Sequence, residues 1–420
     1  MKPKTIEHIT YFRLTLTLAS PLSIGASESA STDRDVVLDA REKPMIPATA
    51  IAGVYRSLCS KADQDKYFGC IAPPKKKDEK NPQDAISSEL LFYDAKLNSK
   101  APMHKTVRDS VALDENKYAK KGAKFDFEVV ETGAEFIGFV EARSKAAADF
   151  FRTLLGKKVS FGAKSTRGYG QVALKVEVIE FDFAENRDVQ LAAWLGFDMF
   201  DSTAWVEEIP RKSEDSGTET TITLQLRQKG GLSIRQYYTN PGGADSGQLT
   251  LRDETPVIPG TSWAGMFRHH MATLLECKSD DKKVSDVFGF VSKNEKSSAK
   301  SKIRFSESKL VGATEKQLTR NAIDRFTGGT KQGALFTEIT VYGGTTNLEI
   351  SFDNSMSGDA KFALFAALMD LHHGYAAVGG LTSIGRGLFE ITAVGEDDIS
   401  DEGTLEEKLK EVICFEKGQA

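Results

Sequence analysis

Hydrophobic and polar residues alternate along FRLTLTLASPLSIG, residues 12–25. Every second residue from Phe12 to Leu18 is apolar, which is the period of a half-buried β-strand. The stretch ITLQLRQKGGLSI at 222–234 repeats the alternation and ends in the same Leu-Ser-Ile. We therefore predict a strand at the start of each of two similar halves.

A predicted helix start also occurs twice. KPMIPATAIAGVYRSL at 43–58 recurs as TPVIPGTSWAGMFRHH at 255–270. Proline is expected just inside each helix, where its missing N–H costs nothing. Apolar residues at helical spacing follow, and Arg56 and Arg268 lie off that face. Each arginine is either solvated or contacts phosphate.

Three further segments complete an internal repeat, which is the first feature to look for in a chain of this length. YFGC at 67–70 is repeated as VFGF at 287–290, and LLFYDAKL at 90–97 as IRFSESKL at 303–310. SFGAKSTRGYGQV at 160–172 is repeated as VGGLTSIGRGLFEITAV at 378–394. We predict a first module at 1–185, a linker at 186–217 and a second module at 218–420. Strands and helices interleaved in this order favour an α+β fold with antiparallel sheets of ferredoxin-like type.

Composition narrows the class of protein without identifying it. The 420 residues are 40% hydrophobic and 27% charged, with a net charge of −5. No apolar run approaches the roughly 18 residues of a membrane span, and the N-terminus lacks an apolar signal region, so we expect a cytoplasmic protein without membrane partners. The four scattered cysteines are expected to be reduced thiols. Any phosphate-binding surface must be local, because the overall charge is negative.

The glycine-rich turns at 160–172 and 378–394 are not known nucleotide motifs. Gly380 and Gly385 have P-loop spacing, but the Lys-Ser/Thr and the following helix are missing. A bare glycine hairpin is one interpretation. Lys164, Arg167 and Arg386 favour contact with an RNA or nucleotide backbone, since glycines admit a phosphate backbone and the cations supply charge.

Taken together, the initial strand, the Ile-Pro-x-Ser/Thr helix start, the Phe-Gly and the glycine-rich loop resemble the RAMP superfamily of CRISPR-associated proteins. The resemblance is to backbone subunits of type III (Csm/Cmr-like) effector complexes, and it spans both halves. It implies two fused modules, each a modified ferredoxin-like (RRM-like) antiparallel sheet with helices and a thumb hairpin. The implied partners are crRNA, complementary target RNA and other type III subunits, including a large polymerase-like subunit.

The resemblance also extends to two polar segments at 107–130 and 321–344, which are similar to the family's thumbs. In the family, thumbs wedge into the guide–target duplex. From the residues alone, each segment is a polar β-hairpin or a solvated basic loop, rich in lysine in the first half and containing Arg325 in the second.

Catalytic aspartates are implied only by the resemblance, which places one between the first strand and the Ile-Pro helix. Asp33 matches best, because it precedes Asp39 by six residues, and Asp35 is the reserve. Asp245 follows Asp33 at the offset that separates the two Ile-Pro motifs, although Asp253 breaks the downstream spacing by two. Such a carboxylate could orient or deprotonate a ribose 2′-hydroxyl, giving a 2′,3′-cyclic phosphate, or hold a divalent cation such as Mg²⁺. No nucleotide or organic cofactor is expected.

We predict a guide-binding backbone subunit that cleaves target RNA at Asp33 and Asp245. The RNA contacts would be sequence-independent, and the candidates are Arg56, Lys164, Arg167, Gly168, Tyr169, Arg268, Arg325, Gly385 and Arg386. No histidine or cysteine spacing indicates a metal site. Two alternatives stay open: a non-catalytic crRNA-binding structural subunit, and a guide-processing endoribonuclease of the same superfamily.

Overall fold

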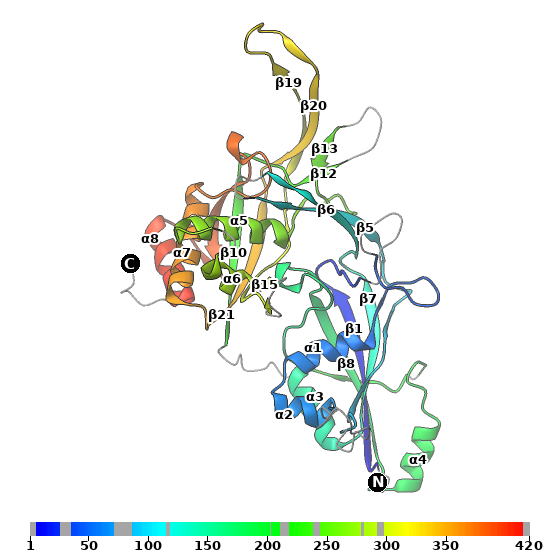
Figure 1. Cartoon of the computed structure of the whole chain (residues 1–420). Coiled ribbons are helices and arrows are strands. Elements are labelled where there is room, and N and C mark those ends of the chain that lie inside the picture. Colours follow the sequence, from blue (N-terminus) through cyan, green and yellow to red (C-terminus); the bar gives the residue numbers. More distant parts are fainter. Residues whose placement is uncertain are drawn as a thin grey trace, which may run out of the picture. The chain divides into compact units, whose positions relative to one another are not determined.

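A computed structural model of the protein describes residues 6–25, 35–70, 86–114, 118–201, 203–210, 218–237, 244–278, 281–291 and 298–414. The chain forms two compact units (Figure 1). Unit 1 contains Met1–Val107, Asp126–Ser165 and Gly170–Asp215, and unit 2 contains Arg108–Phe125, Thr166–Tyr169 and Ser216–Ala420. Two short segments of the first half of the sequence therefore belong to unit 2.

Unit 1 is an antiparallel sheet with helices on it. Its elements are β1 (His8–Leu18), β2 (Met45–Ile46), α1 (Ala48–Ser57), α2 (Lys61–Tyr67), β3 (Leu90–Phe92), β4 (Ala95–Leu97), β7 (Glu135–Ala142), α3 (Lys145–Leu155), β8 (Val172–Asp182), α4 (Arg187–Leu195) and β9 (Val206–Glu208). The strand order is β2-β4-β7-β1-β8-β9, and β3 also pairs with β7. The first strand, β1, thus lies between β7 and β8, the other two long strands of the sheet, as in a ferredoxin-like sheet.

The alternating residues of the first strand form the core of unit 1, as predicted. Phe12, Leu14 and Leu16 are fully buried, and Phe12 packs edge-on against Phe151 of α3. Helix α1 adds Tyr55, whose ring also meets Phe151. The side-chain hydroxyl of Ser144 accepts the Ala147 N–H and so caps α3.

The segment predicted to be a linker, 186–217, is folded over much of its length. Strand β9 pairs with β8, and α4 brings Trp194 against the sheet face opposite α1 and α3. Trp194 donates a hydrogen bond to the Tyr11 hydroxyl at 3.1 Å, in a cluster with Phe181 and Phe197. The polar composition of this segment predicts a connector, but its scattered aromatic residues cover the second face of the sheet.

Unit 2 repeats this plan. Its elements are β10 (Glu219–Lys229), β11 (Gly231–Leu232), β12 (Arg235–Tyr237), β13 (Ser246–Gln248), β14 (Val257–Ile258), α5 (Gly260–Leu274), α6 (Lys282–Phe288), β15 (Phe290–Val291), β16 (Ser298–Ala299), β17 (Ile303–Phe305), β18 (Ser308–Lys309), β19 (Thr314–Ile323), β20 (Thr330–Tyr342), β21 (Thr345–Asp353), α7 (Gly358–His373), β22 (Leu388–Val394), β23 (Asp397–Asp398) and α8 (Glu402–Ile413). The main sheet has the order β17-β21-β10-β22-β23. The central strand β10 again lies between the other two long strands, β21 and β22, so the predicted α+β class and the internal repeat are confirmed.

The helix starts of the two units differ from the prediction by one position. Pro47 and Pro259 occupy the N-cap, immediately before the first helical residue of α1 and α5. Their φ angles of −59° and −61° suit the turn of the chain into the helix. Trp263 of α5 is fully buried and donates a hydrogen bond to the Ser308 hydroxyl at 3.1 Å.

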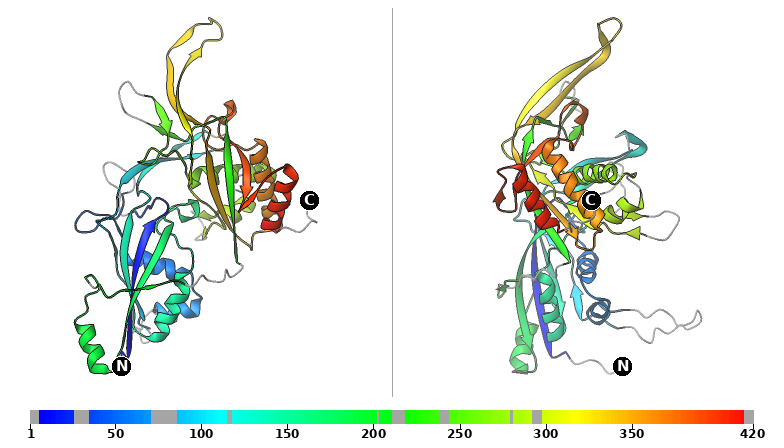
Figure 2. Two further views of the ribbon diagram at one scale, coloured as in Figure 1. Left: turned by 180° about the vertical axis from the view of Figure 1, so that it is seen from behind. Right: turned by 90° about the vertical axis from the view of Figure 1, so that its left-hand side faces the viewer.

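Each half of the sequence also contains a long β-hairpin. Strands β5 (Lys105–Leu113) and β6 (Ala119–Val130) form the first, and β19 and β20 form the second, which extends away from the body of unit 2 in both views of Figure 2. From end to end, β6 has the same sequence of exposed and buried positions as β20 does from Thr330 to Val341. Both predicted thumb segments are therefore hairpins. Within the described residues, no helix is long and apolar enough to cross a membrane.

Candidate nucleic-acid interface

The two glycine-rich turns share one backbone conformation. We call residues 160–171 the first glycine loop and residues 377–388 the second glycine loop. Each contains a single 3₁₀ turn, η1 (Ser165–Arg167) in the first and η2 (Thr382–Ile384) in the second. Neither loop leads into a helix, because each continues into the last long strand of its sheet.

Left-handed residues flank both turns at matching positions. Lys164 and Leu381 precede the turns with φ of 59° and 58°, and Gly168 and Gly385 follow them with φ of 81° and 80°. The two loops therefore correspond position by position, with Lys164 aligned to Leu381. Glycine is favoured after each turn because other residues rarely adopt this conformation.

A second glycine of each loop is required by close backbone packing. A Cβ atom on Gly170 would overlap the carbonyl oxygen of Phe161, and one on Gly387 would overlap that of Val378. The same residues anchor the loops to the rest of the fold, since the Gly387 N–H donates to the Gly231 carbonyl at 2.8 Å. These glycines are thus required by the backbone packing of the loops, whether or not a ligand binds there.

This correspondence shows that the predicted RNA-binding arginines of the two loops occupy different positions of the repeat. Arg167 corresponds to Ile384, which is exposed, whereas Arg386 corresponds to Tyr169. Arg167 and Arg386 are therefore not equivalent residues of a repeated motif, although both are predicted from the sequence to contact RNA.

Arg386 is buried in an intramolecular network. Its guanidinium donates to Glu338 at 2.6 Å and to the Thr340 hydroxyl at 2.8 Å, and only 5% of the residue is exposed. Glu338 also pairs with Arg320 of β19. These contacts tie the second glycine loop to the base of the β19–β20 hairpin, so the structure turns the predicted phosphate ligand Arg386 toward the protein. Gly385 beside it has open space around its Cα.

Tyr169 is buried in a different ion-pair cluster. Its hydroxyl accepts a hydrogen bond from Arg108 at 3.3 Å, and Arg108 forms a two-point ion pair with Glu307. The side chains of Arg108 and Glu307 are only 3% and 5% exposed. Burial raises the pKa of Tyr169. All three residues belong to unit 2, so Tyr169 is a packing residue here, and its predicted RNA contact lacks an exposed ring.

Residues Thr166–Tyr169 of the first glycine loop, which belong to unit 2, pack closely on the start of α5 and the end of β17. A Cβ on Gly260 would overlap the Arg167 carbonyl oxygen, and one on Gly168 would lie 2.6 Å from the Glu307 nitrogen. The Arg167 side chain nevertheless stays exposed, and desolvation by the surrounding protein lowers its pKa. Among the residues that the structure describes, its guanidinium has no hydrogen-bond or ion-pair partner. Among the described residues, Arg167 is thus a charge without a counter-ion.

Lys164 belongs to unit 1 and lies over an aromatic ring. Its ammonium is 3.1 Å from the centroid of Phe127, which corresponds in the hairpin pattern to Glu338 of unit 2. A cation–π contact of this kind stabilises the loop against β6. The structure therefore gives this predicted RNA contact an intramolecular partner.

The two helix arginines have equivalent structural roles. Arg56 donates to the Gly69 carbonyl at 3.2 Å, and Arg268 lies 5.9 Å from the ring centroid of Phe288. Both therefore reach the Phe-Gly turn that ends the short second helix of their unit. The sequence predicted either a solvated arginine or a phosphate contact at these positions. The structure instead shows a contact within the protein, which joins α1 to α2 and α5 to α6.

The second hairpin exposes the remaining predicted cation. Arg325 is exposed in the turn at its tip, beside Phe326, which is fully exposed. The Asp324 carboxylate accepts the N–H groups of Phe326 and Thr327 at 2.9 and 3.0 Å, and these bonds lower its pKa. The tip is thus a defined turn that presents Arg325 to solvent.

Asp245 lies at the base of the same hairpin. Its carboxylate Oδ2 accepts the Thr337 N–H at 2.8 Å, and its own N–H donates to the Thr337 carbonyl at 2.8 Å. The residue is exposed, and its Oδ1 has no hydrogen-bond partner in the described part of the chain. Asp33 lies outside the described residues. Its reserve Asp35 is half-buried and precedes Val36, whose N–H donates to Glu128 of β6.

The downstream aspartates explain the broken spacing between the two copies. Asp39 accepts the N–H of Lys43 at 2.9 Å, and Asp253 accepts that of Thr255, the equivalent residue, at 3.1 Å. These bonds lower the pKa of both carboxyl groups. Asp39 and Asp253 therefore stabilise one shared turn shape from different positions, and the spacing to Asp245 carries no information about catalysis.

The donor set does not form a metal centre. No three histidine, cysteine, aspartate or glutamate side chains of the described residues come together. Asp245 offers one carboxylate, and the nearby Glu338 is already engaged by two arginines. The described residues around Asp245 therefore do not fit a Mg²⁺ site.

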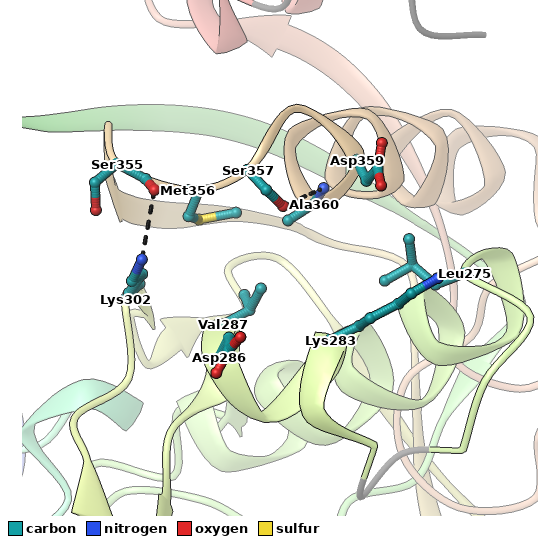
Figure 3. Close-up of a pocket in the computed structure, with 10 residues that line it drawn as sticks. All are labelled: Leu275, Lys283, Asp286, Val287, Lys302, Ser355, Met356, Ser357, Asp359 and Ala360. Atoms are coloured by element: carbon teal, nitrogen blue, oxygen red, sulfur yellow. Dashed lines mark hydrogen bonds between the residues drawn. The ribbon is translucent and has the colours of Figure 1, made fainter.

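A shallow pocket lies elsewhere on unit 2, between α6 and the start of α7 (Figure 3). Lys283 and Lys302 line it together with Asp286 and Asp359, so its charges balance. Lys302 already donates to the Ser355 carbonyl at 3.4 Å. This pocket shares no residue with the glycine loops or with Asp245.

A comparison with protein-family descriptions matches the chain to the RAMP superfamily over residues 15–173 and 216–390. The two matched regions coincide with the two copies of the repeat and leave the segment containing α4 and β9 between them. No curated protein matches the chain.

Proposed function

The chain belongs to the RAMP superfamily, whose members include CRISPR-associated RNA-binding proteins, and on this premise we propose that it is a guide-binding backbone subunit of a type III effector complex. The observation that supports this most strongly is the exposed Arg167 on a glycine-rich backbone turn, which has no ion-pair partner in the part of the chain that the structure describes. Such a turn can approach a sugar-phosphate strand closely and supply charge without reading bases.

The hairpins support a role in holding a guide–target duplex. The β19–β20 hairpin ends in exposed Phe326 and Arg325, an apolar ring beside a cation. A ring of this kind can stack on a base, while the arginine contacts phosphate. Partner type III subunits, crRNA and complementary target RNA are the partners that this role requires.

Asp245 is the proposed catalytic residue of the second module, and Asp33 that of the first. The Thr337 N–H holds Oδ2 of Asp245 at the hairpin base, and the residue is exposed, so Oδ1 is accessible to a ligand. From there it can accept the proton of a ribose 2′-hydroxyl as that oxygen attacks the adjacent phosphate. The 5′-oxygen of the next nucleotide leaves as its bond to phosphorus breaks and takes a proton from water, giving a 2′,3′-cyclic phosphate and a 5′-hydroxyl.

The test is cleavage of complementary RNA by the assembled complex. Asp33→Ala and Asp245→Ala should each remove a different set of products, and Asp245→Asn should behave as Asp245→Ala, since the amide keeps the Thr337 bond but cannot take the proton. Cleavage that is unchanged in both variants would leave a structural guide-binding subunit. Processing of unprocessed repeat RNA by the purified chain alone would identify the guide-processing enzyme instead.

A further inference from the structure

In each copy of the repeat, the end of the first strand meets the glycine loop in the same way. The Ser23 carbonyl accepts the Ala163 N–H at 2.7 Å, and the Ser233 carbonyl accepts the Gly380 N–H at 2.8 Å. Both serines belong to the repeated Leu-Ser-Ile, which continues as Gly25 in the first copy and as Arg235 in the second. We call this meeting point the loop joint.

The pairing of the next strand confirms that positions 25 and 235 are equivalent. Gly25 forms a β-bridge with Val36, and Arg235 pairs with Gln248. The offset between Val36 and Gln248 is the same as that between the two repeated helix starts.

The two copies therefore carry an arginine at different members of one pair of sequence positions, the end of the strand and the turn of the glycine loop. The first copy has Gly25 at the strand end and Arg167 in the loop, and the second has Arg235 at the strand end and Ile384 in the loop. Each copy of the repeat therefore has one arginine at these two positions of its sequence, although the position differs. Both positions are exposed in both copies, so packing of the fold does not require an arginine at either of them.

Arg235 is available to a ligand, and Arg386 is not. Arg235 is exposed, and its Nε lies 3.7 Å from the point that a Cβ on Gly380 would occupy. Within the described chain it has no ion-pair partner, whereas Glu338 neutralises Arg386. The exposed positive charge beside the second glycine loop is thus that of Arg235.

We propose that Arg235 is the phosphate-binding residue of the second loop joint and has in the second copy of the repeat the role proposed for Arg167 in the first; this rests on the proposed RNA-binding function. Its guanidinium can donate two parallel N–H groups to the oxygens of one phosphodiester. Gly380 presents no side chain beside it, so the sugar-phosphate strand can come within hydrogen-bond distance of the loop backbone.

Binding of the full-length protein to fluorescein-labelled single-stranded RNA of mixed sequence tests this, measured by anisotropy between 50 and 300 mM salt. Arg235→Gln should weaken binding roughly three- to tenfold and flatten the slope of log K against log salt by about 0.7, the value for one lost phosphate contact on a single strand. Arg227→Gln is the matched control, because Arg227 is exposed on β10 of the same unit but pairs with Glu390 at 2.9 Å. It should leave the slope unchanged.

Moving the arginine to the loop position distinguishes the loss of a phosphate contact from a disturbance of the fold as the cause of weaker RNA binding. Arg235→Gly combined with Ile384→Arg gives the second joint the arrangement of the first, and it should restore the slope that Arg235→Gly loses. If Arg235→Gln binds like the unmodified protein while Arg167→Gln is weakened, Arg235 is not a ligand and RNA binding stands. If the unmodified protein binds no RNA, the proposed function fails together with this assignment.

Discussion

The buried ion pair of Arg108 and Glu307 should be one of the most sensitive points of unit 2. The two side chains are 3% and 5% exposed and meet through both guanidinium nitrogens, and Arg108 also holds the Tyr169 hydroxyl. Removing one partner leaves the other charge buried without compensation, which costs roughly 3–5 kcal/mol. We expect Arg108→Ala and Glu307→Gln each to lower the free energy of unfolding of unit 2 by this amount.

A neighbouring pair provides the matched control. Arg304, three residues before Glu307, pairs with Glu219, but these side chains are 38% and 36% exposed. Exposed pairs contribute about 0–1 kcal/mol, so Arg304→Ala should have little effect. Replacing both buried charges, as in Arg108→Met with Glu307→Leu, should destabilise less than either single change, because no charge is then left unpaired.

Trp263 reports the unfolding of unit 2 specifically. It is fully buried in that unit, and the other two tryptophans, Trp194 and Trp205, are in unit 1. Urea titration followed by Trp263 fluorescence, with Trp194 and Trp205 changed to phenylalanine, gives the free energy for one unit. If Arg108→Ala and Glu307→Gln lower the free energy of unfolding no more than Arg304→Ala does, the buried ion pair is refuted. The assignment of Arg108–Phe125 and Thr166–Tyr169 to unit 2 is then refuted as well.

Three further outcomes follow from the same structure. Gly385→Ala should cost about 1–2 kcal/mol for its left-handed φ alone, whereas Gly387→Ala should cost roughly 2–5 kcal/mol, because its Cβ would also overlap the Val378 carbonyl; equal losses in urea unfolding would contradict this. Burial lowers the pKa of His372, so unit 2 should lose stability as the pH falls below about 6.5, and His372→Asn should remove that loss; an unchanged pH profile would show that the imidazole does not titrate there. The Thr404 N–H lowers the pKa of Asp401 at the start of α8, so its contribution is present above about pH 4 and is lost on further acidification; Asp401→Asn should be less sensitive to pH between 5 and 3.

Local patterns were sufficient to predict the repeated plan of the fold. Alternation indicated the buried residues of β1, and the repeated Ile-Pro indicated the starts of α1 and α5, because both signals depend on near neighbours in sequence. The covering role of α4 and β9 was not predictable in this way, since Trp194 and Phe197 acquire a role only when the sheet face is formed.

The candidate site was predictable only as a region. The glycine loops were found, but the neutralised charge of Arg386 depends on Glu338, which is distant in sequence, and the burial of Tyr169 depends on Arg108 and Glu307. No local pattern reports such long-range pairs. Arg235 did carry a signal, because Leu-Ser-Ile-Gly and Leu-Ser-Ile-Arg occupy equivalent places in the repeat, but within an alternating stretch it was indistinguishable from an ordinary strand residue.

We propose that this chain holds an RNA strand by contacts to the RNA sugar-phosphate backbone, whatever the base sequence. Isolating the protein with its natural partners and sequencing the RNA bound to it tests this directly. We expect RNA of uniform length with unrelated internal sequences. Isolation free of RNA, or with one fixed sequence, would contradict it.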